Sequence, residues 1–248
     1  MYIGVDGCSA GWIAVQYGED GYEDAALYDD IGELWAAHHE TAERILIDIP
    51  IGLREHSNAK RPCDDAARTK LSPNRHSSVF SVPVRATVYE ESYEDAKETQ
   101  ERRTDGSLGV QSWGIAGKIA ELDTFLREME PDAVGTIREA HPEVCFWALN
   151  GDSATKYSKT GQPAAAFWER IEILEAIDGA IVENVRGAST DLDAKVGTDD
   201  VIDAFVLALT ASPITGRLRT LPEEWPEGDR GDPTDELPME MVYASQSG

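Results

Sequence analysis

The sequence predicts a mixed α/β fold in a single domain, with an antiparallel hairpin at its start and helices on both faces of the sheet. Three observations carry this prediction. Residues 2–17 alternate like two strands around a Gly-rich turn, residues 45–49 are apolar on both faces apart from Asp48, and several later segments repeat apolar residues at helical spacing. A strand that is apolar on both faces is typical of a central parallel strand covered by helices.

The first element is a β-hairpin. β-branched and aromatic residues fill 2–5 and 12–17, and Gly7, Ser9, Ala10 and Gly11 supply the turn. Asp6 then falls where the first strand meets the turn. Such a carboxylate is ordinarily a turn cap, so a metal-binding role for Asp6 depends on finding partners elsewhere in the chain. The segment 23–30 is expected to add a third strand.

A helix over 31–42 precedes the second buried strand, 45–49, which Pro50 and Gly52 end. Asp48 is therefore a second carboxylate at the carboxyl end of a strand. An interior aspartate requires a partner or a cation, because its burial otherwise costs free energy that nothing offsets.

A basic segment follows. Between Arg54 and Arg85 the chain has seven basic residues against three acidic ones, although the whole protein has a net charge of -25. The segment is loop-rich, with a short helix expected from Asp64 to Lys70. A solvated loop would explain it, but a basic segment in so acidic a chain favours an anionic ligand.

Helices are expected over 90–103 and 111–129, and we treat about 88–130 as a helical insertion within the single domain 1–248. A strand then carries Glu139 near its end, and His141 shares its face. A helix begins at Pro142 and is closed by Gly151, and Glu143 is interpreted as an ordinary first-turn acid favoured by the helix dipole. Another helix lies within 158–177.

The last predicted helix, 197–212, is strongly apolar but begins with acids. Asp200 and Asp203 are three residues apart and share one face, and with Asp199 they exceed what capping requires. The rest, about 216–248, is expected to be an extended acidic tail that ends in a short strand over 239–243.

Composition limits the function. The chain of 248 residues carries 47 acidic and 22 basic residues, which would normally exclude a nucleic-acid partner. Acids spread over segments that are otherwise able to fold indicate a halophilic protein, because molar salt shortens the Debye length to about 3 Å. No apolar run is long enough for a membrane helix or a signal peptide, so a cytoplasmic protein without a membrane partner is expected. The three cysteines form no CxxC pair and are expected to be free thiols.

Carboxylates on strand ends and on a closing helix converge only where a cation holds them, since their mutual repulsion is otherwise costly. Oxygen ligands alone favour Mg²⁺ or Mn²⁺, and two such ions about 4 Å apart hydrolyse phosphodiesters in known enzymes. The predicted metal ligands are Asp6, Asp48, Glu139, Asp200 and Asp203.

At this point the chain resembles a known family. The motifs GVDGCSAGW, IDIPIGL, RPCDDAAR, NRHSSVFSVPVR, EAHPEVCFWALNG, SKTG and TDDVIDAFVLALTA are similar, in order, to those of an uncharacterised family of predicted RNase H-like nucleases, domain of unknown function 429. The resemblance implies an RNase H-like mixed sheet whose first three strands are antiparallel. It also implies that Asp6 and Asp48 are the first two acids of that superfamily. DVIDA, with Asp200 and Asp203, resembles the DxxDA of Holliday-junction resolvases, and Glu139 and His141 match the EAHPE segment as catalytic candidates.

The leading hypothesis is a metal-dependent nuclease that hydrolyses DNA or RNA. The residues expected to contact phosphate are Arg75, Ser77 and Ser78, helped by Arg61, Arg85, Lys156 and Lys159. The alternatives are an actin-like phosphotransferase or ATPase, although no GxxxxGK[ST] loop is present, and a nucleic-acid-binding module without turnover. The number of metal ions, the choice between DNA and RNA, and the oligomeric state stay open.

Overall fold

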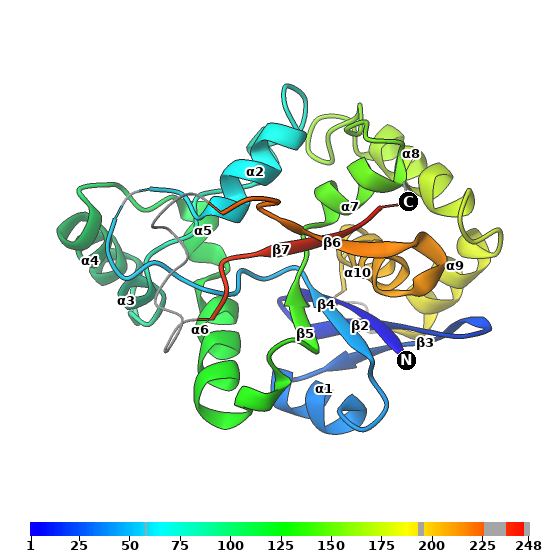
Figure 1. Ribbon diagram of the computed structural model, residues 1–248, viewed down its shortest axis with the longest axis horizontal. Helices are drawn as coiled ribbons and strands as arrows, with labels where there is room; N and C mark the ends of the chain where they lie inside the picture. The colour runs from blue at the N-terminus through cyan, green and yellow to red at the C-terminus, as the bar shows by residue number, and fades with distance from the viewer. Residues whose placement is uncertain (58, 193–195, 226–236, 246–248) are drawn as a thin grey trace.

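A five-stranded mixed sheet forms the centre of the protein (Figure 1). The structure, a computed structural model, describes residues 1–57, 59–192, 196–225 and 237–245. The strand order is β3-β2-β1-β4-β5, with the first three strands antiparallel and β4 and β5 parallel to β1. This confirms the predicted mixed α/β class. The strands are β1 (Tyr2–Cys8), β2 (Gly11–Gly18), β3 (Gly21–Tyr28), β4 (Arg44–Ile47) and β5 (Ile137–Glu139).

The opening hairpin is tighter than the sequence predicts. β1 continues to Cys8, and Asp6 pairs with Ile13 inside the ladder. Gly11 makes the short turn possible, because its φ of 145° is a conformation that residues with a side chain rarely adopt. The prediction that Asp6 marks the junction of strand and turn was therefore wrong: Asp6 lies within the strand.

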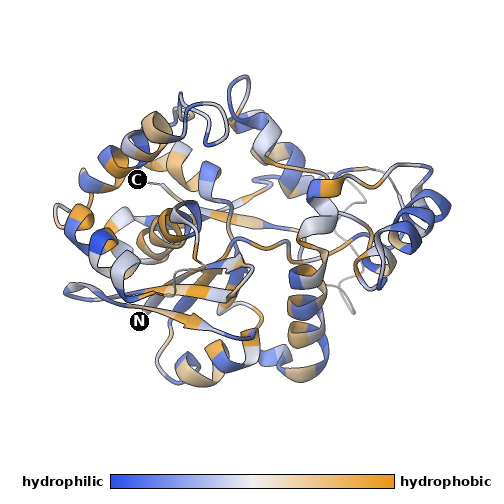
Figure 2. Ribbon diagram, turned by 180° about the vertical axis from the view of Figure 1, so that it is seen from behind, coloured by the Kyte–Doolittle hydropathy of each residue, from blue (hydrophilic) through white to orange (hydrophobic). Residues whose placement is uncertain are grey.

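Helices cover both faces of the sheet, as predicted (Figure 1). On β1, Ile3 and Val5 belong to the core shared with α1 (Ile31–His38) and α6 (Ala116–Thr124). Tyr2 belongs to the core on the opposite face, beside α10 (Thr198–Ala211). Figure 2 shows apolar residues along the strands and the helices that cover them, and a mainly hydrophilic α4 at the far end. The bounds are α1 (Ile31–His38), α4 (Tyr93–Thr104), α6 (Ala116–Thr124), α7 (Pro142–Leu149), α8 (Pro163–Glu175), α9 (Ile181–Asp191) and α10 (Thr198–Ala211).

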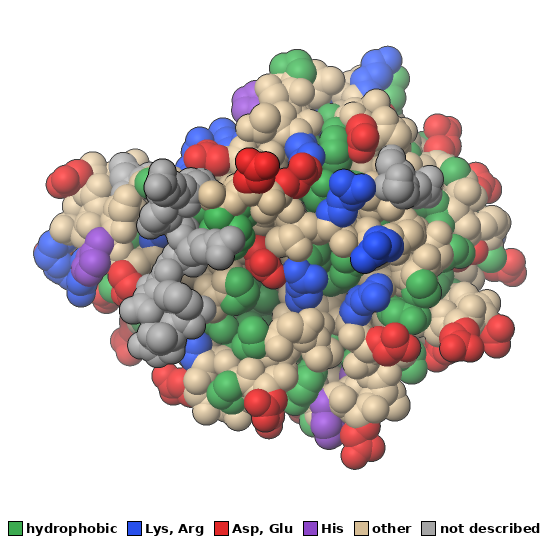
Figure 3. All heavy atoms as spheres, viewed as in Figure 1, with side chains coloured by type: hydrophobic (Ala, Val, Ile, Leu, Met, Phe, Trp, Pro, Cys, Tyr) green, Lys and Arg blue, Asp and Glu red, His purple; other side chains and the backbone are tan. Residues whose placement is uncertain are grey.

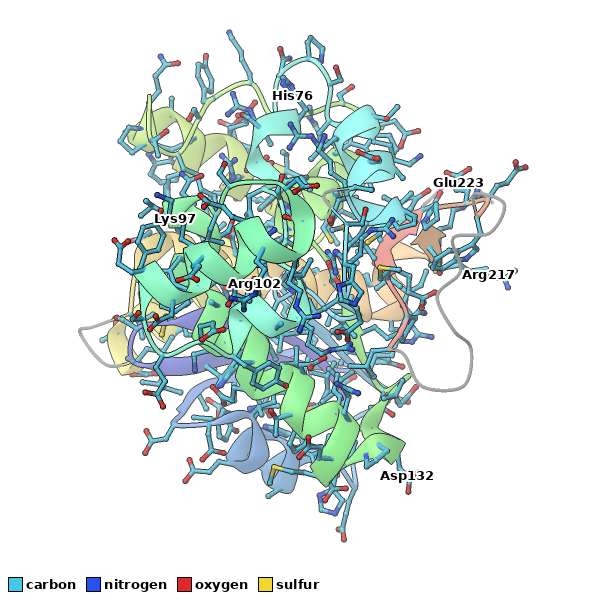
Figure 4. The ribbon with its side chains drawn as sticks, turned by 90° about the vertical axis from the view of Figure 1, so that its left-hand side faces the viewer. His76, Lys97, Arg102, Asp132, Arg217 and Glu223 are labelled. Atoms are coloured by element: carbon cyan, nitrogen blue, oxygen red, sulfur yellow. The ribbon has the colours of Figure 1, made fainter. Side chains whose placement is uncertain are left out.

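Of the two helices predicted for the segment 88–130, the first forms as α4 and the second is broken into shorter pieces. The predicted helix 111–129 is broken into α5 (Val110–Gly114), α6 and a π-helical turn over Phe125–Met129. Glycines on each side of the break, Gly114 and Gly117, weaken helix propensity there. α3 (Arg85–Val88) precedes α4, and Figure 4 shows Lys97 and Arg102 of α4 on the side of the insertion that faces the viewer.

The carboxyl-terminal part is more ordered than predicted. β6 (Arg217–Leu221) and β7 (Met241–Ser245) form a second, two-stranded antiparallel sheet. Leu221, Met241 and Tyr243 are buried with apolar residues of α2 (Pro62–Lys70). The predicted final strand is confirmed with a shift of two residues, while the extended tail was wrong for 217–221, and 226–236 lie outside the described residues. α9, which the sequence analysis did not predict, packs beside α10.

Two further expectations concern the whole chain. Cys8, Cys63 and Cys145 are free, as predicted, and the latter two are buried. Within the described ranges, no helix has the length and apolar character that a membrane crossing requires.

Candidate metal centre

Three aspartates converge where β1, β4 and α10 meet. Each offers one carboxylate oxygen, and these three atoms lie within 4.8 Å of one another. Asp6 comes from β1, and Asp48 follows β4, where its backbone N–H continues the ladder by donating to Val5 O at 3.0 Å. Asp203 lies in the second turn of α10. The structure therefore brings together residues that are about 200 positions apart in sequence.

A glycine allows α10 to lie this close to β1. A Cβ at Gly4 would stand 2.1 Å from Ala204 O and 2.1 Å from Ala208 N, so residue 4 has to lack a side chain if the helix is to keep its place. Gly4 and Asp6 point to the same face of β1, since side chains alternate along a strand. The contact at Gly4 thus sets the distance between Asp6 and Asp203, the residue directly before Ala204.

The carboxyls of Asp6 and Asp203 are buried and that of Asp48 is half-buried beside them, and this raises the pKa values of all three. Asp6 and Asp203 are 8% and 7% exposed. Burial, followed by the charges of Asp48 and Asp203, raises the pKa of Asp6 well above its usual range. Burial raises the pKa of Asp48 to about 6 although His141 counteracts it, and burial also raises that of Asp203 against the effect of Lys159. The cluster is costly when ionised, and a cation would relieve this cost.

The donor set fits a divalent cation. Asp203 Oδ1 is buried and accepts no hydrogen bond from any described residue, while Oδ2 is ion-paired with the Lys159 ammonium. A buried carboxylate oxygen without a partner is rare in folded proteins. Because the convergent groups are carboxylates, the residues would suit Mg²⁺ or Mn²⁺ better than a soft metal.

Glu139 lines the same cavity as these aspartates but is not part of their cluster, because it belongs to a buried ion-pair network with Arg61 and Asp64. Arg61 donates to Glu139 Oε1 at 2.6 Å and Oε2 at 2.8 Å, and Ile51 N donates to Oε2 at 2.6 Å. Arg61 also holds both oxygens of Asp64, at 2.7 and 2.9 Å. Burial raises the pKa of Glu139 to about 7, and Arg61 limits the rise. A second set of possible ligands, Cys63, Asp64 and Glu139, lies in this network, whose carboxylates Arg61 already neutralises.

Asp200 is also outside the cluster. Its Oδ2 accepts a hydrogen bond from Gly197 N at 3.2 Å and so caps the start of α10. Asp199, in the same turn, is exposed. Of the five predicted metal ligands, the structure thus brings together Asp6, Asp48 and Asp203. Sequence spacing could not separate Asp200 from Asp203, because residues three apart on a helix share a face.

His141 and Glu143 line the same cavity as the aspartates. His141 Nδ1 lies 3.1 Å from Glu143 N, a backbone N–H that can only donate, so Nδ1 accepts and Nε2 carries the proton. Nε2 lies 3.4 Å from Ser78 O.

The Glu143 carboxylate is ion-paired with the buried Arg170 and accepts from Thr155 Oγ1 at 2.8 Å. Burial raises its pKa, but Arg170 and Thr155 outweigh burial and hold the pKa below its usual range. Glu143 is thus more than the first-turn acid of the sequence prediction. No sequence signal marks Arg170, because a single arginine in an amphipathic helix such as α8 ordinarily lies on the exposed face.

The cavity has a volume of about 250 Å³. The aspartates, His141 and Lys159 line one part of it. Apolar side chains line another part, namely Ile49, Phe80, Val82, Ile115 and Met241. A small polar or anionic group that reaches the aspartates would therefore also contact an apolar wall.

The predicted phosphate contacts are mostly engaged within the protein. Arg75 donates to Thr155 O and Lys156 O at 3.0 Å each. Arg61 is ion-paired with Asp64 and Glu139, and Arg85 is ion-paired with Glu55 and Asp123. The remaining predicted contacts differ in position: Ser77 and Lys156 are exposed outside the cavity lining, whereas Ser78 and Lys159 line it.

Figure 3 shows further Lys and Arg side chains gathered over β6 and β7, a basic area that the sequence analysis did not single out. Arg217 and Arg219 of β6 are exposed there, and Figure 4 shows Arg217 at the outer edge of the molecule.

Comparison with known proteins gives one match. The model of a family described as "Protein of unknown function (DUF429)" matches residues 4–227. No curated protein and no solved structure matches the chain significantly.

Proposed function

The chain belongs to this family of unknown function, and we propose that it is a metal-dependent nuclease with an RNase H-like fold. One observation carries the proposal: Asp6, Asp48 and Asp203 converge in a cavity, and the buried Oδ1 of Asp203 has no partner among the described residues. Carboxylates arranged in this way are suited to binding a divalent ion, and phosphodiester hydrolysis is a principal use of such sites.

The sheet supports the fold part of the proposal. Its first three strands are antiparallel, as the resemblance implies, and the first strand carries the first acid. The second acid directly follows β4, and the third lies on the helix that covers both strands. A shared fold does not by itself specify an activity, so the assignment to nucleases depends on the acids and the cavity.

The residues have distinct roles in the proposed reaction. Asp6, Asp48 and Asp203 would hold the ion, which when bound would lower the pKa of an attacking water and offset charge on the phosphate. His141 lines the cavity and carries its N–H on Nε2, so it would be placed to donate a hydrogen bond to a phosphate oxygen. Ser78 and the apolar wall line the same cavity and would contact the rest of the nucleotide.

The cavity favours a nuclease over the ATPase alternative. Pockets that enclose a drug-sized ligand usually exceed about 300 Å³. The volume of about 250 Å³ suits one phosphate group with part of its nucleotide better than an enclosed nucleoside triphosphate. The cleavage experiment below distinguishes a nuclease from a module that binds nucleic acid without cleaving it.

The test is cleavage of labelled DNA and RNA oligonucleotides with Mg²⁺ or Mn²⁺ in molar KCl. Asp6→Asn and Asp48→Asn should each abolish cleavage, because an amide is a poor ligand and removes one negative charge. Asp199→Asn is the matched control. Because Asp199 is exposed on α10, this variant should cleave oligonucleotides like the wild type. Metal-dependent binding of oligonucleotides without cleavage across single-stranded, duplex and branched substrates would refute the nuclease and leave the binding module.

A further inference from the structure

Lys159 has an unusual position for a residue predicted to contact phosphate. It lies in the loop between α7 and α8, lines the cavity, and directs its ammonium onto Asp203 Oδ2. Its side chain is 24% exposed and that of Asp203 is 10% exposed, so little water competes with this ion pair. The Lys159 ammonium is therefore ion-paired with one of the six carboxylate oxygens that the three aspartates provide.

The loop is fastened so that Lys159 stays there. The Glu169 carboxylate of α8 accepts Lys156 N at 2.7 Å and Tyr157 N at 2.9 Å. On the other side, Arg75 donates to the carbonyls of residues 155 and 156 at 3.0 Å each. Two side chains from separate segments thus fix the backbone just before Lys159, and a surface lysine would need no such support.

The charges near the cluster suit one divalent ion rather than two. Three aspartates and one lysine have a net charge of -2 when all are ionised, which a single divalent ion offsets in the substrate-free protein. A second ion would require more carboxylate oxygens. Those of Glu139 are taken by Arg61, and Asp200 caps the start of α10.

We propose that Lys159 takes the place of a second metal ion, so that the site binds one ion through Asp6, Asp48 and Asp203 Oδ1. Lys159 is then a positioning residue: it neutralises Oδ2 and fixes the orientation of the Asp203 carboxylate, leaving Oδ1 directed at the ion. The inference rests on the proposed function, because it concerns the metal that this function requires.

The experiment is a titration of the EDTA-stripped chain of 248 residues with Mn²⁺, in which paramagnetic resonance measures the free ion. The wild type should bind one Mn²⁺ per chain, and Asp203→Asn should lose that binding. Lys159→Met should bind Mn²⁺ with a Kd lower by about tenfold or more, because it removes a positive charge in contact with one of the ion's ligands. Lys159→Arg should restore the wild-type Kd. Lys156→Met, an exposed lysine of the same loop, is the matched control and should leave the Kd unchanged.

The outcomes separate this inference from the proposed function. Two Mn²⁺ ions per wild-type chain, or an unchanged Kd in Lys159→Met, would overturn the role of Lys159. In either case, cleavage of oligonucleotides by the same samples would show that the proposed nuclease activity is nevertheless correct. Absence of Mn²⁺ binding by the wild type, or binding that persists in Asp203→Asn, would refute the metal site itself and the role of Lys159 with it.

Discussion

Asp48→Asn should make the metal-free protein more stable at neutral pH, although it alters a buried site. Burial is the largest cause of the rise in the pKa of Asp48, from 3.8 to about 6. At about 1.4 kcal/mol per pKa unit, ionised Asp48 costs the folded state about 3 kcal/mol. An asparagine has no charge to bury, so the variant should gain free energy of unfolding of up to that amount.

The sign of the pH dependence follows from the same shift. A carboxyl whose pKa is raised by folding binds more protons in the folded state, so stability falls as pH rises between the two values. The free-energy cost of ionising Asp48 in the folded protein should be absent below pH 3.8, grow between pH 3.8 and about 6, and reach its full value above about pH 6. Because burial rather than charge repulsion is its main cause, molar salt should reduce it only in part.

The assay is urea unfolding of wild type and Asp48→Asn with EDTA, in molar KCl, at pH 4 and pH 8. The two proteins should have nearly equal stability at pH 4, and the variant should be more stable at pH 8. Asp199→Asn, the exposed control on α10, should differ from wild type by about 0.5 kcal/mol or less. Saturating Mn²⁺ should stabilise the wild type and not Asp48→Asn. If Asp48→Asn is less stable than wild type at pH 8 with EDTA, ionised Asp48 does not destabilise the metal-free protein, and the prediction is refuted.

Three other predictions follow from the fold and the composition. Gly4→Ala should lower the free energy of unfolding in urea by about 1–3 kcal/mol and reduce cleavage, because the added Cβ would displace α10. Gly117→Ala, at an open helical position, should have neither effect, and equal effects of the two variants would contradict the close packing of α10 on Gly4. Arg61→Met should cost about 3–5 kcal/mol of unfolding free energy, since it leaves Glu139 and Asp64 buried without a cation; unchanged stability with weaker oligonucleotide binding would show instead that Arg61 contacts substrate. If the 47 acidic residues are a halophilic adaptation, dialysis from about 3 M to 0.1 M KCl should unfold the chain as the Debye length grows to about 10 Å, and a circular dichroism spectrum that does not change would refute this.

The sequence predicted the elements that local patterns encode. The hairpin, the buried strand before Asp48 and the apolar helix that carries Asp203 were all recognisable, because alternation and helical spacing are properties of neighbouring residues. Elements with weaker local signals were misjudged or missed. α9 has few buried residues, and β6 acquires its apolar environment only by pairing with β7 and packing on α2.

By itself, the sequence identified the carboxylates on or just after strands and near the start of a closing helix, and therefore which could meet. Only the tertiary structure decided which of them do. Glu139 and Asp48 look equivalent in sequence, yet Arg61 reaches Glu139 from 78 positions away, whereas no guanidinium pairs with Asp48 in the part of the chain that the structure describes. The physical reason is that the ionisation and availability of a buried carboxylate depend on the nearest cation in space. Chain proximity fixes local conformation, but it does not specify where the side chains of distant segments come together.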